Sequence, residues 1–217
     1  TFSFFTLISR ILGYFRDVLI AIYLGSGPLA DTFFVAFRIP NTFRRLFAEG
    51  TFNAAFVPSY SSELSKNKKN AHKFVTSIFS FLTIILFFLV LLIEILMPLF
   101  VFLIAPGFKE NSDKMDLAIT LTRITFPFLL FICLASFFSG ILNSHNKFAA
   151  ASAAPIILNI LLIAILLFSN TIGDNLVIFL AYGVSIAGFS QFLFLYFCVK
   201  KYYIPKINFR FKLNKKI

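Results

Sequence analysis

Residues 74–104 of this chain read FVTSIFSFLTIILFFLVLLIEILMPLFVFLI, with Glu94 as the single charged residue. A helix needs about 20 apolar residues to cross the roughly 30 Å hydrocarbon core of a membrane, so this stretch predicts a transmembrane helix. Five further apolar runs, bounded by polar residues, Gly or Pro, complete an expected all-α integral membrane fold with six transmembrane helices. The expected helices cover residues 2–24, 29–60, 74–104, 117–142, 148–168 and 176–199.

The composition of the 217-residue chain is that of a membrane protein. Apolar residues make up 59% and charged residues 13% of the sequence, and the mean hydropathy is +0.89. Soluble domains carry about a quarter charged residues, so a soluble globular fold is excluded. Cys133 and Cys198 both lie in apolar runs, which argues against a disulfide framework or a metal cluster.

The net charge of +11 comes chiefly from the loops on one side of the expected membrane. The basic residues of these loops and of the segment after the sixth helix are Lys66, Lys68, Lys69, Lys73, Lys147, Lys200, Lys201, Lys206, Arg210, Lys212, Lys215 and Lys216. The alternate loops hold only Lys109 and Lys114. Because cytoplasmic loops are enriched in Lys and Arg, both ends are expected in the cytoplasm, with residues 202–217 as a basic cytoplasmic segment. The charge therefore gives no reason to expect nucleic-acid binding.

The basic residues left inside the expected helices are all arginines, and most fall in the first two helices beside acidic residues. This charged cluster comprises Arg10, Arg16, Arg38, Arg44, Arg45, Asp17, Asp31 and Glu49. A central Arg costs about 2.5–3.5 kcal/mol on insertion scales, so such residues normally face a cavity. The guanidinium group matches phosphate bidentately and stays charged when desolvated. The cluster therefore indicates a cavity for a phosphate-bearing substrate.

Simpler roles for these residues stay open at this point. Arg10 is also placed to snorkel to the membrane interface, and Asp17 to neutralise Arg10 or Arg16. Asp31 opens the second expected helix, which suits a helix cap as well as a ligand or a gate.

Other polar residues in the apolar runs are expected to be structural. Asn159 and Gln191 predict hydrogen bonds between helices, and the small residues in 135–140 and 183–188 predict close helix packing. Arg123 and Glu94 are expected to anchor helix ends at the interface.

Residues 9–17 read SRILGYFRD and residues 31–50 read DTFFVAFRIPNTFRRLFAEG. They resemble the first-helix and second-helix signatures of the MurJ (MviN) lipid II flippase family, which belongs to the multidrug/oligosaccharidyl-lipid/polysaccharide (MOP) exporter superfamily. Weaker similarities to the family follow at residues 105–108, 124–127, 140–143 and 205–208.

The resemblance implies one six-helix lobe, residues 1–201, of a two-lobed transporter in the bacterial cytoplasmic (inner) membrane. Such a transporter moves lipid II, an undecaprenyl-pyrophosphate-linked disaccharide-pentapeptide, to the outer leaflet by alternating access. The partners implied are lipid II and the bilayer, with no cofactor or metal and with coupling to the membrane potential. The matching residues are Arg10, Arg16 and Arg44 for the pyrophosphate, and Asp17, Asp31, Arg45 and Glu49 for gating or a cavity charge network.

Only the first lobe of the family is matched, so a second lobe with any ion site is expected outside this sequence, whether through fragmentation, gene splitting or decay. Two alternatives remain: an exporter of another polyisoprenyl-linked oligosaccharide, and an inactive truncated fragment. A membrane enzyme is less favoured, because the sequence has no aspartate-rich motif for Mg²⁺. His72 and His145 also lack an acidic neighbour in the sequence that would make either one a catalytic base.

Overall fold

The structure is a computed structural model that describes residues 2–44 and 51–207. Within these residues the chain is helical and contains no strand, which confirms the all-α class. The helices are α1 (Phe2–Leu24), α2 (Pro28–Arg44), α3 (Thr51–Lys66), α4 (Lys68–Ile95), α5 (Met97–Ile104), α6 (Ser112–Thr125), α7 (Phe128–Ser144), α8 (Phe148–Leu167), α9 (Ser169–Ile172) and α10 (Leu176–Val199), with 3₁₀ turns η2 (Pro106–Glu110) and η3 (Gly173–Asn175).

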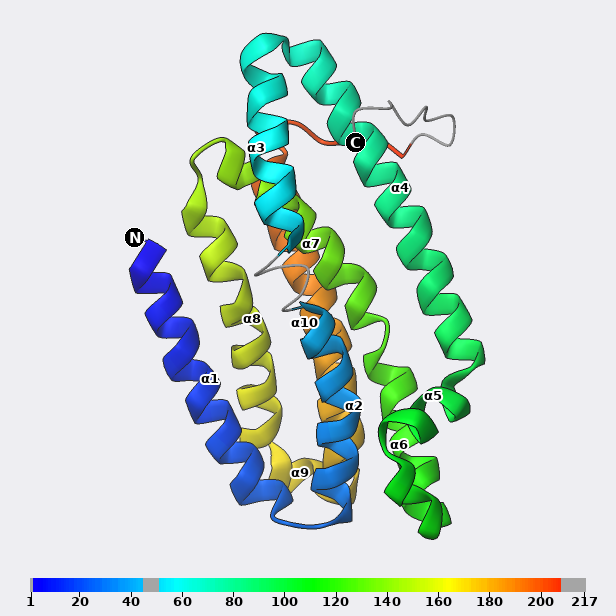
Figure 1. The fold of residues 1–217 in the computed structure, drawn as a ribbon. Coiled ribbons are helices and arrows are strands. Elements are labelled where there is room, and N and C mark those ends of the chain that lie inside the picture. The colour runs from blue at the N-terminus through cyan, green and yellow to red at the C-terminus, as the bar shows by residue number, and fades with distance from the viewer. Residues whose placement is uncertain (1, 45–50, 208–217) are drawn as a thin grey trace.

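The long helices run lengthwise through one elongated bundle (Figure 1). The α3–α4 and α7–α8 connections and the end of α10 lie at the top of Figure 1, which we call the upper end. The α1–α2, α5–α6 and α8–α10 connections lie at the opposite, lower end. Successive long segments of the chain therefore run in alternating directions, as successive membrane crossings require.

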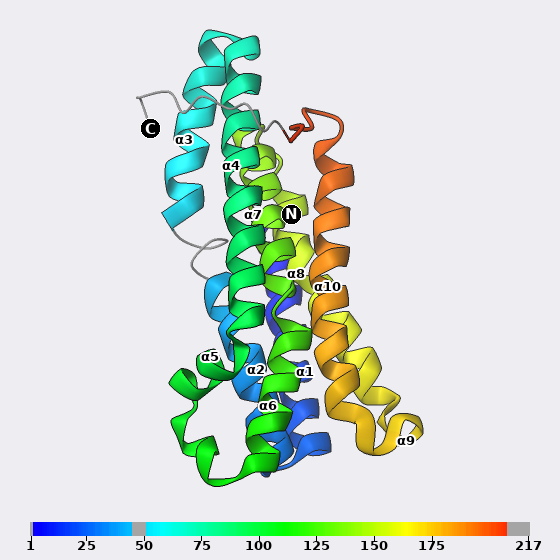
Figure 2. The same ribbon diagram turned by 90° about the vertical axis from the view of Figure 1, so that its right-hand side faces the viewer.

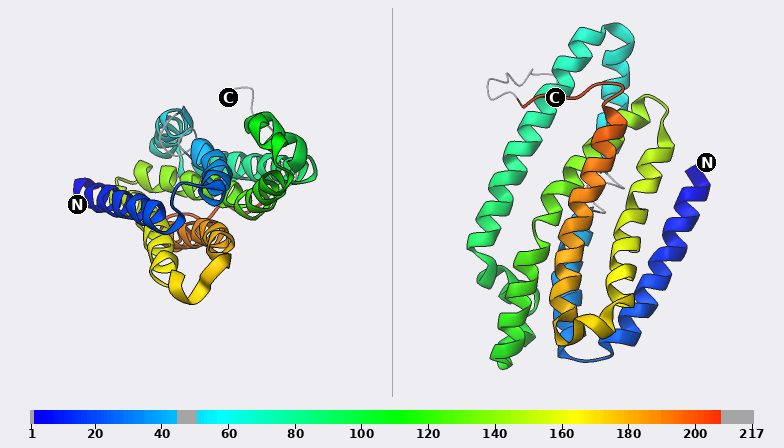
Figure 3. Two further views of the ribbon diagram at one scale, coloured as in Figure 1. Left: turned by 90° about the horizontal axis from the view of Figure 1, so that it is seen from below. Right: turned by 180° about the vertical axis from the view of Figure 1, so that it is seen from behind.

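α7 forms the centre of the bundle and is buried on most of its surface, including the rings of Phe128, Phe137 and Phe138. α10 packs against both α7 and α8, and α8 packs against α1 (Figure 2). α1 and α4 lie at opposite edges of the bundle (Figure 3). The two signature-bearing helices α1 and α2 make few contacts with each other, so α1 is held mainly by α8.

Two glycines of α10 allow close helix packing. A Cβ added to Gly188 would lie 2.6 Å from the Phe128 ring of α7, and one added to Gly183 would press on Ile165 and Leu162 of α8. The prediction of close packing at residues 183–188 is therefore confirmed.

Four helical segments among the described residues are long and apolar enough to cross a membrane: Lys68–Ile95, Ser112–Ser144, Phe148–Leu167 and Leu176–Val199. The surface of α4 exposes Phe87, Phe88 and Ile95, as a lipid-facing helix does. α1 carries Arg10, Arg16 and Asp17, and α2 ends at Arg44 after 17 residues. The membrane crossings expected for the first two helices therefore stay a prediction.

Two expected helices are each divided into two, and a third is described only in part. The expected helix 29–60 corresponds to α2 and α3, and residues 45–50 between them lie outside the described part of the chain. The expected helix 74–104 begins earlier, at Lys68, and is interrupted at Leu96 before Pro98.

The expected helix 117–142 likewise begins earlier, at Ser112, and is interrupted at Pro127. Proline lacks a backbone N–H and clashes with the preceding turn, which explains the breaks near Pro98 and Pro127. The earlier starts at Lys68 and Ser112 follow asparagine caps, in which the Asn67 and Asn111 side chains accept backbone N–H bonds.

Candidate site at Arg16

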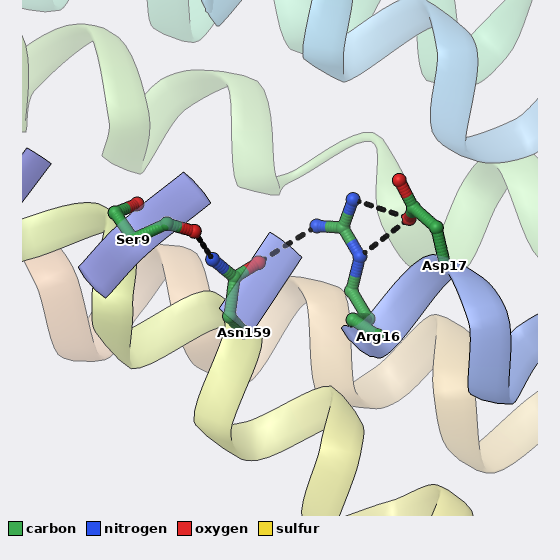
Figure 4. Close-up of polar contacts among 4 residues, drawn as sticks. All are labelled: Ser9, Arg16, Asp17 and Asn159. Carbon is green, nitrogen blue, oxygen red and sulfur yellow. Dashed lines mark hydrogen bonds and ion pairs between the residues drawn. The ribbon is translucent and has the colours of Figure 1, made fainter. Parts of the chain in front are cut away.

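Arg16 of α1 is the best-connected residue of the predicted charged cluster (Figure 4). Its Nε and Nη2 donate to Oδ1 of Asp17 at 2.9 and 2.6 Å, and its Nη1 donates to Oδ1 of Asn159 at 2.9 Å. The Arg16 side chain is 13% exposed, whereas that of Asp17 is 63% exposed. The guanidinium is thus held on one side by a buried amide and neutralised on the other side by a largely exposed carboxylate (Figure 4).

Asn159 of α8 is buried, and both ends of its amide group are used. While Oδ1 accepts from Arg16, Nδ2 donates to the Ser9 carbonyl oxygen of α1 at 2.9 Å. Gly13 faces this amide, so that no side chain of α1 stands between the two helices at that level. The expectation of a hydrogen bond between helices is confirmed for Asn159, whose bond to Arg16 the sequence did not indicate.

Phe37 of α2 completes the surroundings of Arg16. The Arg16 guanidinium carbon lies 5.5 Å from the centre of the Phe37 ring, within the range of a cation–π contact. Side chains of α1, α2 and α8 therefore converge on one guanidinium. Because the phenyl face is apolar, the cation is partly desolvated without losing its hydrogen bonds.

The other arginines of the predicted cluster do not join this network within the described residues. Arg10 and Arg38 are exposed on α1 and α2. Arg44 is the last residue of α2, and its side chain lies outside what the structure describes. Arg45 and Glu49, expected to pair or to act in gating, also lie outside the described residues.

Asp31 lies in the first turn of α2, at the lower end of the bundle. Its backbone N–H donates to the Gly27 carbonyl oxygen, so Asp31 is inside the helix and does not cap it. Its carboxylate accepts a hydrogen bond of 2.6 Å from Nζ of Lys114 on α6. Lys114 also lies 4.4 Å from the centre of the Phe108 ring. The sequence identified Asp31 but not this partner, which is far away in the chain.

Two further expectations concern polar residues outside this site. Gln191 was expected to bond to another helix, but its amide donates to the Ala187 carbonyl oxygen of its own helix, α10. The bond seen for the Gln191 amide nitrogen therefore lies within α10, and a bond from this residue to another helix stays a prediction. No group of His, Cys, Asp and Glu residues suited to a metal ion occurs among the described residues.

Comparison with known proteins assigns the chain to a family. A family model described as lipid II flippase MurJ matches residues 20–217. The chain belongs to the lipid II flippase MurJ family.

Over the aligned residues, relatives in the MurJ family are about two fifths identical to this chain. A probable lipid II flippase MurJ of Rickettsia prowazekii is 40% identical over 200 residues, 92% of this chain and 39% of that protein. The corresponding Rhizobium tropici protein is 43% identical over 90% of this chain and 38% of its own length. The lipid II flippase MurJ of Burkholderia cenocepacia is 38% identical over 89% of this chain and 38% of its own length.

A solved MurJ structure shares the fold. The lipid II flippase MurJ in an inward closed conformation superposes with a TM-score of 0.80 and 33% identity, over 96% of this chain and 43% of that one. The resemblance seen in the two signatures is thereby confirmed, and the chain is a multi-pass membrane protein. It spans about two fifths of the length of the MurJ proteins that it matches.

Proposed function

We propose that this chain is the first lobe of a transporter that flips lipid II across the bacterial cytoplasmic membrane by alternating access. In this proposal residues 1–201 form the lobe, and residues 202–217 lead toward a second lobe of the kind that the longer relatives have room for. Family membership supports the cargo. The observation that carries the proposal is the Arg16 guanidinium, held by Asn159 and Asp17.

Arg16 suits the pyrophosphate of the carrier lipid because the positive charge of its guanidinium is already paired with a carboxylate that a phosphate can replace. Asp17 neutralises the guanidinium, and its own side chain is mostly exposed, so it can exchange Arg16 for water at little cost. A phosphate group then takes the place of that carboxylate on Nε and Nη2. Asn159 keeps its bond to Nη1 throughout, so the cation stays in place while its anionic partner changes.

Arg10 and Arg44 extend this site in the proposal. Arg10 and Arg16 are six positions apart in the chain, which places them about 9 Å apart along the axis of α1. Arg44 ends α2, whose Phe37 already contacts Arg16. Asp31, Arg45 and Glu49 serve in gating or in the cavity charge network, with Asp31 at the lower end and the other two after α2. In this proposal several arginines together neutralise the pyrophosphate as it leaves water. A single cation would not compensate its charge.

Charge also supports an orientation in the membrane. The described lysines of the α3–α4 and α7–α8 connections and of the segment after α10 lie at the upper end, and Lys109 and Lys114 lie at the lower end. Because cytoplasmic loops carry an excess of Lys and Arg, the upper end faces the cytoplasm in this proposal. Asp31 then lies at the periplasmic end, and both chain ends lie in the cytoplasm.

The test is complementation by a chimera, in which residues 1–217 replace the matching part of the Burkholderia cenocepacia relative. The chimera is expected to sustain growth of a flippase-depleted strain, and its Arg16→Ala variant is expected to fail. Arg123→Ala, which removes an exposed arginine outside the site, is the matched control and is expected to grow. Normal growth of the Arg16→Ala chimera at equal membrane abundance would contradict the proposal.

A binding measurement separates lipid II from other cargoes. The purified chain in nanodiscs is titrated with lipid II and with an undecaprenyl-pyrophosphate-linked oligosaccharide of another kind. Loss of a charge-assisted bond costs about 1.5–3 kcal/mol, so Arg16→Ala is expected to raise the Kd for lipid II by about tenfold or more. Equal affinity for both lipids would favour a general exporter of polyisoprenyl-linked oligosaccharides.

A further inference from the structure

The segment after α10 crosses the upper end of the bundle from α10 to α4 (Figure 1, Figure 2). We call residues 202–207 the strap. It leaves α10 through a tight turn in which the Tyr202 and Tyr203 N–H groups both donate to the Val199 carbonyl oxygen. Pro205, farther along the strap, is buried. The strap is therefore packed against the bundle and does not hang free of it.

Two histidine rings hold the strap. His145, at the end of α7, stacks on Tyr202 with 4.7 Å between ring centres and 26° between ring planes. His72 of α4 stacks on Tyr203 at 3.8 Å and 10°. Two consecutive tyrosines are thus each paired with a histidine from a different helix. The two histidines of the sequence, which have no role in the Arg16 site, both contact the strap.

Hydrogen bonds fix the strap to α4 as well. The Tyr203 hydroxyl lies 2.7 Å from Oγ1 of Thr76, one turn beyond His72 on α4. Farther along α4, Oγ of Ser80 donates to the Thr76 carbonyl oxygen at 2.8 Å, and the Lys206 carbonyl oxygen of the strap lies 3.5 Å from the same hydroxyl. The strap consequently follows α4 over two helical turns. On α4, the Tyr203 ring, the Tyr203 hydroxyl and the Lys206 carbonyl oxygen thus each lie against a different residue.

The strap adds to contacts that α3 and α4 already make with α7, where the rings of Phe56 and Phe79 pack on Phe137. α4 lies at the edge and its membrane-spanning stretch is only 17% buried. α3 and α4 form a hairpin, and its α3 arm reaches the same cluster through the Tyr60 hydroxyl, 3.5 Å from Nε2 of His145. The strap and its two histidines therefore fasten the α3–α4 hairpin to α7 and α10.

The charged and titratable groups around the cluster disfavour a proton on either histidine. His145 faces Tyr60 from α3, Lys68 and His72 from α4, and Tyr202 from the strap. Burial lowers the pKa of His145, and the nearby His72 and Lys68 lower that pKa further. On the strap side, Lys147 and Lys201 line a pocket of about 720 Å³ together with Tyr202. Among the described residues no carboxylate forms an ion pair with either histidine.

We propose that the strap is a reversible fastening, docked while His72 and His145 are neutral and released when they take up protons. Its release removes the link between the α3–α4 hairpin and α10 and loosens the upper end of the bundle, while the rings of Phe56 and Phe79 keep the hairpin packed on Phe137 of α7. Each proton adds a positive charge beside Lys68 and beside the other histidine, in a place where water cannot solvate it fully. The inference does not depend on which lipid the protein carries.

Hydrogen–deuterium exchange of the full chain in nanodiscs tests the proposal at about pH 7.5 and about pH 5.5, corrected for intrinsic exchange. The strap peptide and the first turn of α4 are expected to exchange about tenfold faster, relative to the intrinsic rate, at the acid pH. The η2 turn at the lower end serves as the internal control. A double variant, His72→Phe and His145→Phe, keeps both rings but cannot be protonated, and is expected to lose the acid response. Tyr202→Ala with Tyr203→Ala is expected to exchange fast at both pH values.

A second measurement uses a fluorescent ring in the strap. The chain contains no Trp, so Tyr202→Trp introduces a single indole, and the adjoining pocket has room for it. Its emission is expected to shift to the red at the acid pH, as the indole leaves His145 for water, and to stay unchanged when both histidines are Phe. Exchange and emission that do not change with pH, or an equal acid response in the double Phe variant, would overturn the proposal.

Discussion

The Asn159 amide oxygen on α8 accepts a hydrogen bond of 2.9 Å from the Arg16 guanidinium on α1. Asn159 is 5% exposed and also donates to the Ser9 carbonyl oxygen, so its amide cannot turn without losing one of the two bonds. A buried amide positioned in this way orders Arg16 whether or not an anion is bound. Asn159 therefore acts on the proposed substrate through Arg16.

Asn159→Leu keeps the branched shape and the number of heavy atoms of the side chain and removes both bonds. Because Nη1 of Arg16 loses its buried acceptor, the free energy of unfolding is expected to fall by about 1–3 kcal/mol. Thermal unfolding in detergent measures the change. Ile160→Leu, at the exposed neighbouring position on α8, is the control and is expected to be neutral. Equal stability of the two variants would show that the amide contributes nothing to holding α1.

The ion pair between Asp31 and Lys114 is expected to contribute little to stability. The Asp31 side chain is 58% exposed, and exposed pairs contribute about 1 kcal/mol or less. A double-mutant cycle with Asp31→Asn and Lys114→Met is expected to give a small coupling energy that decreases with added salt. Lys109→Met, which removes a lysine placed over Phe102, is expected to show no coupling to Asp31→Asn. A salt-independent coupling of several kcal/mol would contradict this prediction.

Gly188→Ala tests the packing of α10 against α7. The added Cβ would lie 2.6 Å from the Phe128 ring, and relieving such a contact costs roughly 1–3 kcal/mol. Gly107→Ala is the matched control, since a Cβ there meets nothing within 4 Å. Thermal unfolding of both variants is expected to show a lower Tm for Gly188→Ala alone. A Tm equal to that of the native chain would mean that the two helices separate at no cost.

The pH dependence of stability follows from His145. Because burial, His72 and Lys68 lower its pKa, the folded state binds fewer protons than the unfolded state. The free energy of unfolding is therefore expected to decrease as the pH falls below about 6.5, the ordinary pKa of histidine. His145→Gln removes this contribution, so its stability is expected to change less between about pH 7.5 and about pH 5.5. An identical loss in variant and native chain would place the acid sensitivity elsewhere.

The sequence was sufficient to predict features that depend on local composition. Long apolar runs predicted the helical class, and the small residues near Gly188 predicted close packing. The arginine cluster predicted a site that includes Arg16, the residue on which side chains of α2 and α8 converge in the structure. The divisions near Pro98 and Pro127 were missed because the apolar character of the chain continues through both prolines, although the rule that explains them is also local.

Contacts between residues far apart in the chain could not be predicted from the sequence. The partner of Asp31 is 83 positions away, and that of Arg16 on α8 is 143 positions away. Each depends on how far one helix is rotated and shifted against another, which no local pattern specifies. The stacking of His72 and His145 on the strap is of the same kind, and the two residues looked unremarkable for that reason.

The connections across the two ends of the bundle differ in their chemistry. At the lower end, Asp31 and Lys114 join α2 to α6 through opposite charges, and at the upper end stacked rings join α4 and α7 to the strap. Added salt weakens the first kind of contact and acid weakens the second. Salt and acid therefore each weaken a contact at one end of this lobe only, so the two conditions distinguish a response of the lower end from a response of the upper end.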